Sequence, residues 1–253
     1  MPTQQVEELE NLPSWYWWFR NRIDFATQLL KKTHCLRYKW LDLGCGPGGM
    51  TAELAKSLRK NKIIATNTSI YGIEGDITLS DKLMAKGITP LAINLENSTP
   101  ALPNDFDLFT AFDVLEHLQN PDTLLKHIFD ASSKNAVGII TVPAMPILWS
   151  KWDREMNHYR RYTRELLIQQ LTAAGFEVCQ CRYIFNWAFF PALIRKVILA
   201  RQKQINHEFP KSGLFLNKVF YLISHVEWVF YQFGLSFGTS VIALVSKKSF
   251  TNK

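Results

Sequence analysis

A glycine-rich turn is the feature that most constrains what this chain can fold into. Residues 41–49, LDLGCGPGG, close a short apolar stretch at residues 38–43 and precede a stretch with helical spacing at residues 50–58. Glycine permits positive φ and lets a ligand approach the backbone closely, and the start of a helix leaves N–H groups unpaired. A strand, a glycine turn and a helix in this order predict a ligand site at the first crossover of an α/β fold.

The remaining chain continues the alternation of strands and helices. Further strands are expected at residues 69–74, 91–95, 106–112, 136–142, 176–183 and 239–246, and helices at 122–132 and 163–174. Asn120 and Thr163 suit the N-caps of these helices, and Gly175 suits the C-terminal end of the second. Such an alternation predicts βαβ units and a mostly parallel sheet covered on both faces.

Two acidic residues distinguish between the ligands that such a turn can bind. Gly44, Gly46 and Gly49 also satisfy G-x-G-x-x-G, so an NAD(P)-dependent oxidoreductase is a competing interpretation. Asp42 would repel a pyrophosphate, but its carboxylate suits an ammonium group. Glu74, which ends the next strand, can bind both hydroxyls of a ribose. Together they favour a positively charged adenosyl amino acid over a dinucleotide.

Four ordered motifs carry a family resemblance. Residues 41–49 resemble motif I of class I S-adenosylmethionine-dependent methyltransferases. IYGIEGD (70–76), AINLEN (92–97) and FDLFTAFDVLEHL (106–118) resemble the next three strand motifs, the last as in ubiquinone-biosynthesis O-methyltransferases. The resemblance covers about residues 36–183. It implies S-adenosyl-L-methionine as cofactor and a Rossmann-like seven-stranded sheet in which only the last strand is antiparallel.

By the same resemblance, the four motifs supply the cofactor contacts. The expected cofactor-binding residues are Asp42, Gly44, Cys45, Gly46, Gly48, Glu74, Asn94, Leu95, Phe112 and Asp113. Asn94 departs from the family pattern, which usually has an Asp near the adenine. Because the sulfonium already activates the methyl group, the protein must mainly align the acceptor, and a base is needed only if the acceptor loses a proton.

Two histidines are the candidate catalytic bases. His117 follows Glu116 after the fourth strand, and His158 lies in the loop after the fifth. Some relatives use a similar LEH segment in a metal site, and a pair that only shapes the pocket floor is a further interpretation. We assign no metal, because two ligands alone rarely define a site.

Aromatic and basic residues are expected on the acceptor side. The loop after the fifth strand lies where open α/β sheets gather ligands. The aromatic run at residues 15–19 cannot face one core on a helix. The expected substrate-side residues are Trp18, Arg20, Trp149, Arg160, Arg161 and Tyr162. Structural ion pairs for the arginines, and a helix packed on the sheet for the aromatic run, are the alternatives.

Four regions follow from this reading of the chain. Residues 1–35 are an N-terminal aromatic helix acting as a lid, 36–183 the cofactor-binding core, 184–238 an apolar helical insertion, and 239–253 the final strand and tail. Between residues 184 and 237, six Lys or Arg accompany two acids and many aromatic residues. A substrate cap, a homodimer interface and a peripheral contact with an anionic membrane all fit this composition.

Composition limits partners and compartment. The formal net charge is +7, but no dense Lys/Arg run predicts nucleic-acid binding. Four cysteines without a CxxC, and an N-terminus without a signal-peptide pattern, favour a cytoplasmic protein, with the inner membrane face as an option. We expect O-methylation of a small or lipid-linked acceptor, in the latter case with Arg160 and Arg161 near a phosphate. A non-catalytic module that kept the fold is the remaining alternative.

Overall fold

A single mixed sheet organises the chain. The computed structural model describes residues 16–96, 101–200, 213–229 and 235–247. Its seven strands are β1 (Arg37–Leu43), β2 (Ile64–Glu74), β3 (Thr89–Ala92), β4 (Phe106–Phe112), β5 (Ser132–Pro143), β6 (Glu177–Ile184) and β7 (Ser240–Ser246). They lie in the order β3-β2-β1-β4-β5-β7-β6, and only β7 runs antiparallel to its neighbours. The expected Rossmann-like seven-stranded α/β sheet is confirmed.

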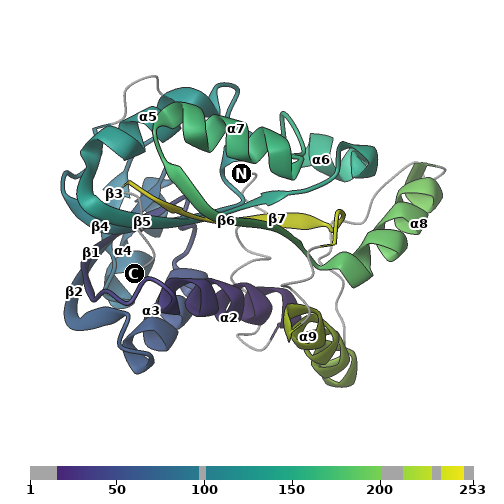
Figure 1. Cartoon of the computed structure of the whole chain (residues 1–253), viewed down its shortest axis with the longest axis horizontal. Coiled ribbons are helices and arrows are strands. Elements are labelled where there is room, and N and C mark those ends of the chain that lie inside the picture. Colours follow the sequence, from purple (N-terminus) through teal and green to yellow (C-terminus); the bar gives the residue numbers. More distant parts are fainter. Residues whose placement is uncertain (1–15, 97–100, 201–212, 230–234, 248–253) are drawn as a thin grey trace.

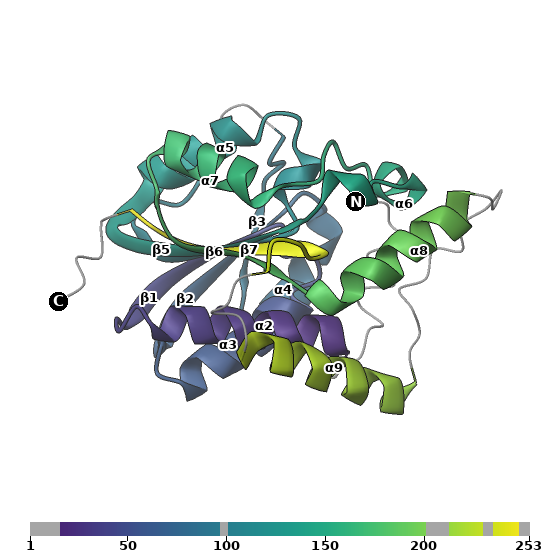
Figure 2. The same cartoon turned by 45° about the vertical axis from the view of Figure 1, so that its right-hand side comes forward.

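Helices cover both faces of this sheet (Figures 1 and 2). The α-helices are α2 (Trp17–Lys31), α3 (Gly49–Lys60), α4 (Ser80–Ala85), α5 (Pro121–Ala131), α6 (Lys151–Glu155), α7 (Arg164–Ala174), α8 (Phe189–Ala200) and α9 (Leu214–Val229). Short 3-10 turns are η1 (Ile77–Leu79), η2 (Leu115–His117), η3 (Pro146–Leu148) and η4 (Asn186–Ala188). Helices α5 and α7 pack on one face, and α2 and α3 on the other.

Buried apolar residues on the two sheet faces form the core. Leu125 and Leu171 belong to the cluster under α5 and α7, whereas Phe25 and Leu58 belong to the cluster under α2 and α3. Strand β5 is buried from Ala136 to Val142, as expected of a central strand covered on both faces. The sheet therefore holds the carboxyl ends of its central strands at one fixed edge.

Strand limits differ from the sequence prediction mainly where pairing continues into polar residues. Strand β2 begins at Ile64 rather than at residue 69, and its extension meets β1 through an irregular register. The extension includes exposed polar residues, which carry no alternating apolar signal. The helix caps predicted for α7 agree with the structure better than these strand limits do. Thr163 accepts from the amide of Leu166, and Gly175 ends α7 with φ +107°.

The N-terminal helix packs on the sheet instead of standing apart from it. Phe25 and Leu29 of α2 are buried in the core under α3. Its first turn contacts the insertion, where the ring of Trp17 lies 5.4 Å from that of Trp187. This arrangement corresponds to the alternative interpretation of the aromatic run. Residues 1–15, including Trp15, lie outside the described residues.

The insertion forms two helices with different surroundings. Helix α9 lies along α2, where Trp228 stacks on Phe25 at 4.4 Å and the hydroxyl of Tyr221 donates to Asp24. Helix α8 projects from the body of the molecule in both views (Figures 1 and 2). Among the described helices, none combines the length and the apolar character needed to cross a membrane.

Candidate active site at the carboxyl ends of β1, β2 and β4

The glycine-rich turn leaves an open space above its middle glycine. Gly44, Gly46 and Gly48 all adopt positive φ, at +62°, +52° and +75°. A Cβ added to Gly44 would lie 2.8 Å from Val114, and one added to Gly48 would lie 2.6 Å from Leu83. A Cβ on Gly46 would meet nothing within 4 Å. Two glycines thus permit tight packing, and the third leaves its backbone accessible to a ligand.

Glu74 lies directly beside this turn. It ends β2, whose register with β1 places Leu43 opposite Ile73. Its Oε2 accepts from the amide of Gly46 at 3.1 Å, and its Oε1 accepts from the amide of Asp76 at 3.2 Å. The structure therefore brings together the turn and the acid that the sequence paired, and the ribose contact of Glu74 stays a prediction.

The buried side chain of Asp42 fixes the glycine-rich turn through the hydrogen bonds that it accepts. Its side chain accepts from the hydroxyls of Thr51 and Thr110, both at 2.5 Å, and Thr110 also accepts from Nε1 of Trp40 at 2.7 Å. These bonds tie β1 to β4 and to the first turn of α3. Burial raises the pKa of Asp42 to about 6, against the effect of the two hydroxyls. The expected contact with a ligand ammonium stays a prediction.

A buried arginine binds the acidic residue that directly follows β4. Arg22 of α2 is 1% exposed and forms an ion pair with Asp113, which has φ +54°. Its guanidinium also donates to the hydroxyls of Thr141 at 3.1 Å and Ser240 at 3.3 Å. Arg22 therefore anchors the N-terminal helix to β4, β5 and β7. The sequence analysis did not single out Arg22, although its place three residues after the aromatic run was an available signal.

The other expected cofactor residues lie around this edge in different settings. Phe112, at the end of β4, and Cys45, in the turn, are half-buried. Asn94 is exposed beyond β3, where its Oδ1 accepts from the amide of Glu96 at 2.9 Å. Leu95 packs against the core. The cofactor contacts of these residues stay predictions.

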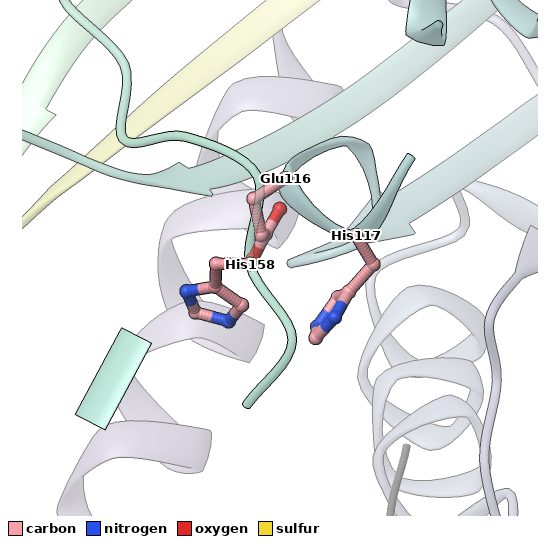
Figure 3. A group of neighbouring side chains, drawn as sticks. All are labelled: Glu116, His117 and His158. Atoms are coloured by element: carbon pink, nitrogen blue, oxygen red, sulfur yellow. The ribbon is translucent and has the colours of Figure 1, made fainter. Parts of the chain in front are cut away.

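Both histidine candidates meet beside Glu116. Figure 3 shows Glu116 and His117 on one short helical turn, η2, and His158 on a separate segment. One ligand atom from each residue lies within 4.8 Å of the others, and the two imidazole rings meet edge to face at 4.6 Å. Glu116 is fully buried, and no neighbouring residue in the described chain donates a hydrogen bond to its carboxylate oxygens.

Burial sets the protonation of this cluster. Burial and then the charge of Asp113 raise the pKa of Glu116 well above its usual range. Burial and then the neighbouring His158 lower the pKa of His117 to about 4. At neutral pH His117 is therefore a neutral imidazole with a free lone pair.

Asp153 orients the second histidine. Its Oδ1 lies 3.2 Å from Nδ1 of His158 and accepts from Nε of Arg161 at 2.7 Å, while its Oδ2 accepts from the amide of Ser150 at 2.8 Å. Although burial acts in the opposite direction, the hydrogen bond from His158 and the charge of Arg161 lower the pKa of Asp153. An ionised Asp153 favours the proton on Nδ1, which leaves the Nε2 lone pair of His158 free.

Both arginines of this loop bind the chain itself. Arg160 donates to the carbonyls of Leu118 at 3.1 Å and Gln119 at 2.6 Å. Arg161 donates to Asp153 and to the carbonyl of Ala144. These guanidiniums hold the loop against the strand ends. Their contact with a substrate anion stays a prediction.

Three aromatic residues and Arg20 complete the acceptor-side prediction. The ring of Tyr162 is fully buried, so it supports the loop from inside. Arg20 is exposed and lies over the ring of Tyr221 of α9 at 4.4 Å, and its substrate contact stays a prediction. Trp18 stacks on the guanidinium of Arg22 at 3.6 Å. Trp149, half-buried after η3, stays a substrate-side prediction.

A family comparison decides between the cofactor classes. The model of a family described as "Methyltransferase domain" matches residues 6–180. The chain belongs to this family. The family match, the four motifs and the sheet topology together make it a class I methyltransferase-type chain. Its cofactor is S-adenosylmethionine.

Curated relatives of this methyltransferase-family chain are distant. It is 23% identical over 128 residues to the mitochondrial ubiquinone biosynthesis O-methyltransferase of Schizosaccharomyces pombe, covering 50% of this chain and 46% of that protein. It is 26% identical over 97 residues to the (S)-coclaurine N-methyltransferase of Thalictrum flavum subsp. glaucum, covering 38% and 26%. The chain thus matches less than half the length of each.

Solved structures share the fold at low identity. An S-adenosylmethionine-dependent methyltransferase from Clostridium acetobutylicum superposes with TM-score 0.54 at 11% identity, covering 95% of this chain and 94% of that one. The [4+2]-cyclase SpnF gives 0.54 at 17%, covering 88% and 81%. The fold alone therefore does not specify the reaction.

The raised pKa of Asp42 predicts a pH effect on stability. Because the folded-state pKa, about 6, lies above the ordinary value of 3.8, protonated Asp42 favours the folded chain. This contribution is full below pH 3.8 and is lost as pH rises through about 6. It amounts to roughly 3 kcal/mol. Urea unfolding of the wild type and Asp42→Asn between pH 4 and 7 should show that loss only in the wild type. If the unfolding free energies of the two proteins changed in parallel with pH, the raised pKa of Asp42 would be contradicted.

Proposed function

We propose that this methyltransferase-family chain transfers the methyl group of S-adenosylmethionine to an oxygen of a small or lipid-linked acceptor. One juxtaposition supports this proposal most directly. The open turn at Gly46 and the carboxylate of Glu74 lie at the same sheet edge as the Glu116, His117 and His158 cluster. A cofactor site and a group that can receive a proton are thus neighbours at the carboxyl ends of β1, β2 and β4.

The residues at the turn fit the cofactor. Gly46 leaves room for a ligand beside its Cα, and the half-buried carboxylate of Glu74 can accept hydrogen bonds from both ribose hydroxyls. Asp42 retains lone pairs beyond those that Thr51 and Thr110 use, and we propose that its negative charge favours the amino acid's ammonium. Asp113, fixed by Arg22, would border the cofactor from β4.

His158 is the proposed base on the acceptor side. When bound, S-adenosylmethionine would supply an activated methyl group for the acceptor oxygen and would be left as a thioether, and Nε2 of His158 would take the acceptor's proton. Asp153 stabilises the imidazolium that results, because its carboxylate already binds Nδ1. His117 is the second candidate.

Exposed apolar faces on the insertion favour a lipid-linked acceptor. On α8, Phe190, Ile194, Val197 and Ile198 share one face and are each more than half exposed. On α9 the corresponding residues are Phe215, Leu222, Val226 and Val229. The exposed cations Arg195 and Lys218 lie on the same helices. We propose that these faces rest on an anionic membrane, with homodimerisation as the competing interpretation.

Glu74→Gln tests the cofactor site. Loss of the charged acceptor should weaken S-adenosylhomocysteine binding on the order of 10- to 100-fold, because hydrogen bonds to a charged group contribute about 1.5–3 kcal/mol. Isothermal calorimetry measures this change. Glu53→Gln is the matched control, since Glu53 pairs with Lys56 on the exposed side of α3. Equal affinities of the two variants would count against Glu74 as a ribose ligand.

Liposome flotation tests the membrane proposal. The wild type should float with vesicles containing phosphatidylserine and not with neutral ones. Ile194→Asp together with Phe215→Asp should abolish flotation, because both side chains are exposed on the proposed contact face. Ile77→Asp, at an equally exposed isoleucine on η1, should float like the wild type. The proposal would be overturned if the wild type formed dimers and remained in the vesicle-free fraction.

A further inference from the structure

We propose that Glu116, His117 and His158 bind one divalent transition-metal ion. One carboxylate oxygen and one nitrogen from each imidazole lie within 4.8 Å of one another (Figure 3). An ion about 2.1 Å from each ligand holds the ligand atoms roughly 3–4 Å apart. Small side-chain rotations would therefore close the site. The structure supplies a third ligand, His158, which the sequence could not place beside the other two, and this changes the expectation that no metal binds.

The buried carboxylate of Glu116 is the strongest indication of a cation site. Buried charges are normally paired, hydrogen-bonded or bound to a metal. Glu116 is fully buried, and no other described residue donates a hydrogen bond to its two oxygens. The positive charges of Arg22 and Arg161 act on Glu116, but both guanidiniums bind other carboxylates. Arg22 binds Asp113, and Arg161 binds Asp153. The lone pairs of Glu116 are thus free for an ion.

His158 is held as metal ligands usually are. A ligating histidine typically donates its other ring N–H to a carboxylate, which fixes the tautomer and the ring orientation. Asp153 provides that carboxylate at Nδ1, 3.2 Å away. Asp153 is itself fixed by Arg161 and by the capping box at Ser150. The site therefore has an outer shell as well as three ligands.

The ligand chemistry indicates which ions fit. Two imidazoles and one carboxylate suit Zn²⁺, Fe²⁺, Co²⁺ or Mn²⁺ better than Mg²⁺ or Ca²⁺, which prefer oxygen. Three protein ligands leave coordination positions open. If the proposed function holds, an oxygen of the acceptor can take such a position, and the ion would lower its pKa. In the loaded protein, Nε2 of His158 would then hold the ion, and the proton of the metal-bound acceptor oxygen would pass to solvent water.

Cobalt titration of the full chain tests the site. Protein stripped of metal by a chelator should bind one Co²⁺, seen by its visible d–d absorption, and Zn²⁺ should displace it. Glu116→Gln and His158→Ala should each abolish the stoichiometric signal. Asp153→Asn should weaken binding about 10- to 100-fold through its loss as an outer-shell partner. His225→Ala, at an exposed histidine on α9, is the control and should leave binding unchanged.

Cofactor binding separates this proposal from the proposed function. Each variant is also tested for S-adenosylhomocysteine affinity, and retained affinity shows that it folds with its cofactor site intact. Absent stoichiometric Co²⁺ binding by the wild type, or equal binding by Glu116→Gln, would overturn the metal site. Co²⁺ binding by a wild type that does not bind S-adenosylhomocysteine would support the metal site and overturn the methyltransferase proposal.

Discussion

The cofactor site depends on the hydrogen bonds that the buried carboxylate of Asp42 accepts. A carboxylate in the interior costs free energy unless hydrogen bonds compensate it. Thr51 and Thr110 supply those bonds, and they come from α3 and β4. The glycine turn between β1 and α3 is consequently fixed at both ends. Gly44 and Gly46 adopt left-handed conformations within this turn, and the amide of Gly46 donates to Glu74.

Buried polar contacts organise the rest of the strand edge in the same way. Arg22 brings the N-terminal helix to Asp113, and Arg161 brings the loop after β5 to Asp153. The first contact joins residues 91 positions apart, whereas the second joins residues eight positions apart within the connection between β5 and α7. The ligand-facing groups are thereby left on rigid supports, with Glu116 as the buried carboxylate that no such contact satisfies.

The sequence predicts the parts of the fold that depend on local chemistry. Apolar runs located the seven strands, and Thr163 and Gly175 located the ends of α7, because caps and periodicity act over a few residues. The proximity of Glu74 to the turn was also predictable, since adjacent parallel strands end at one edge. The motif resemblance supplied the family.

Side-chain partners across long loops could not be predicted in this way. Arg160 and Arg161 have the charge of a phosphate site, but their directions depend on carbonyls and an acid that only the folded loop brings near. Arg20 was assigned to the substrate for its place beside the aromatic run, and its contact with Tyr221 of α9 could not be foreseen from that position. The meeting of His158 with Glu116 is likewise a property of the loop after β5.

Calorimetry of the unmodified chain with S-adenosylhomocysteine and, separately, with NAD tests the account most directly. The site predicts saturable one-to-one binding of the adenosyl amino acid and no measurable binding of the dinucleotide. Binding of NAD alone, or of neither compound, would contradict the claim that the turn at Gly46 and the carboxylate of Glu74 form an S-adenosylmethionine site.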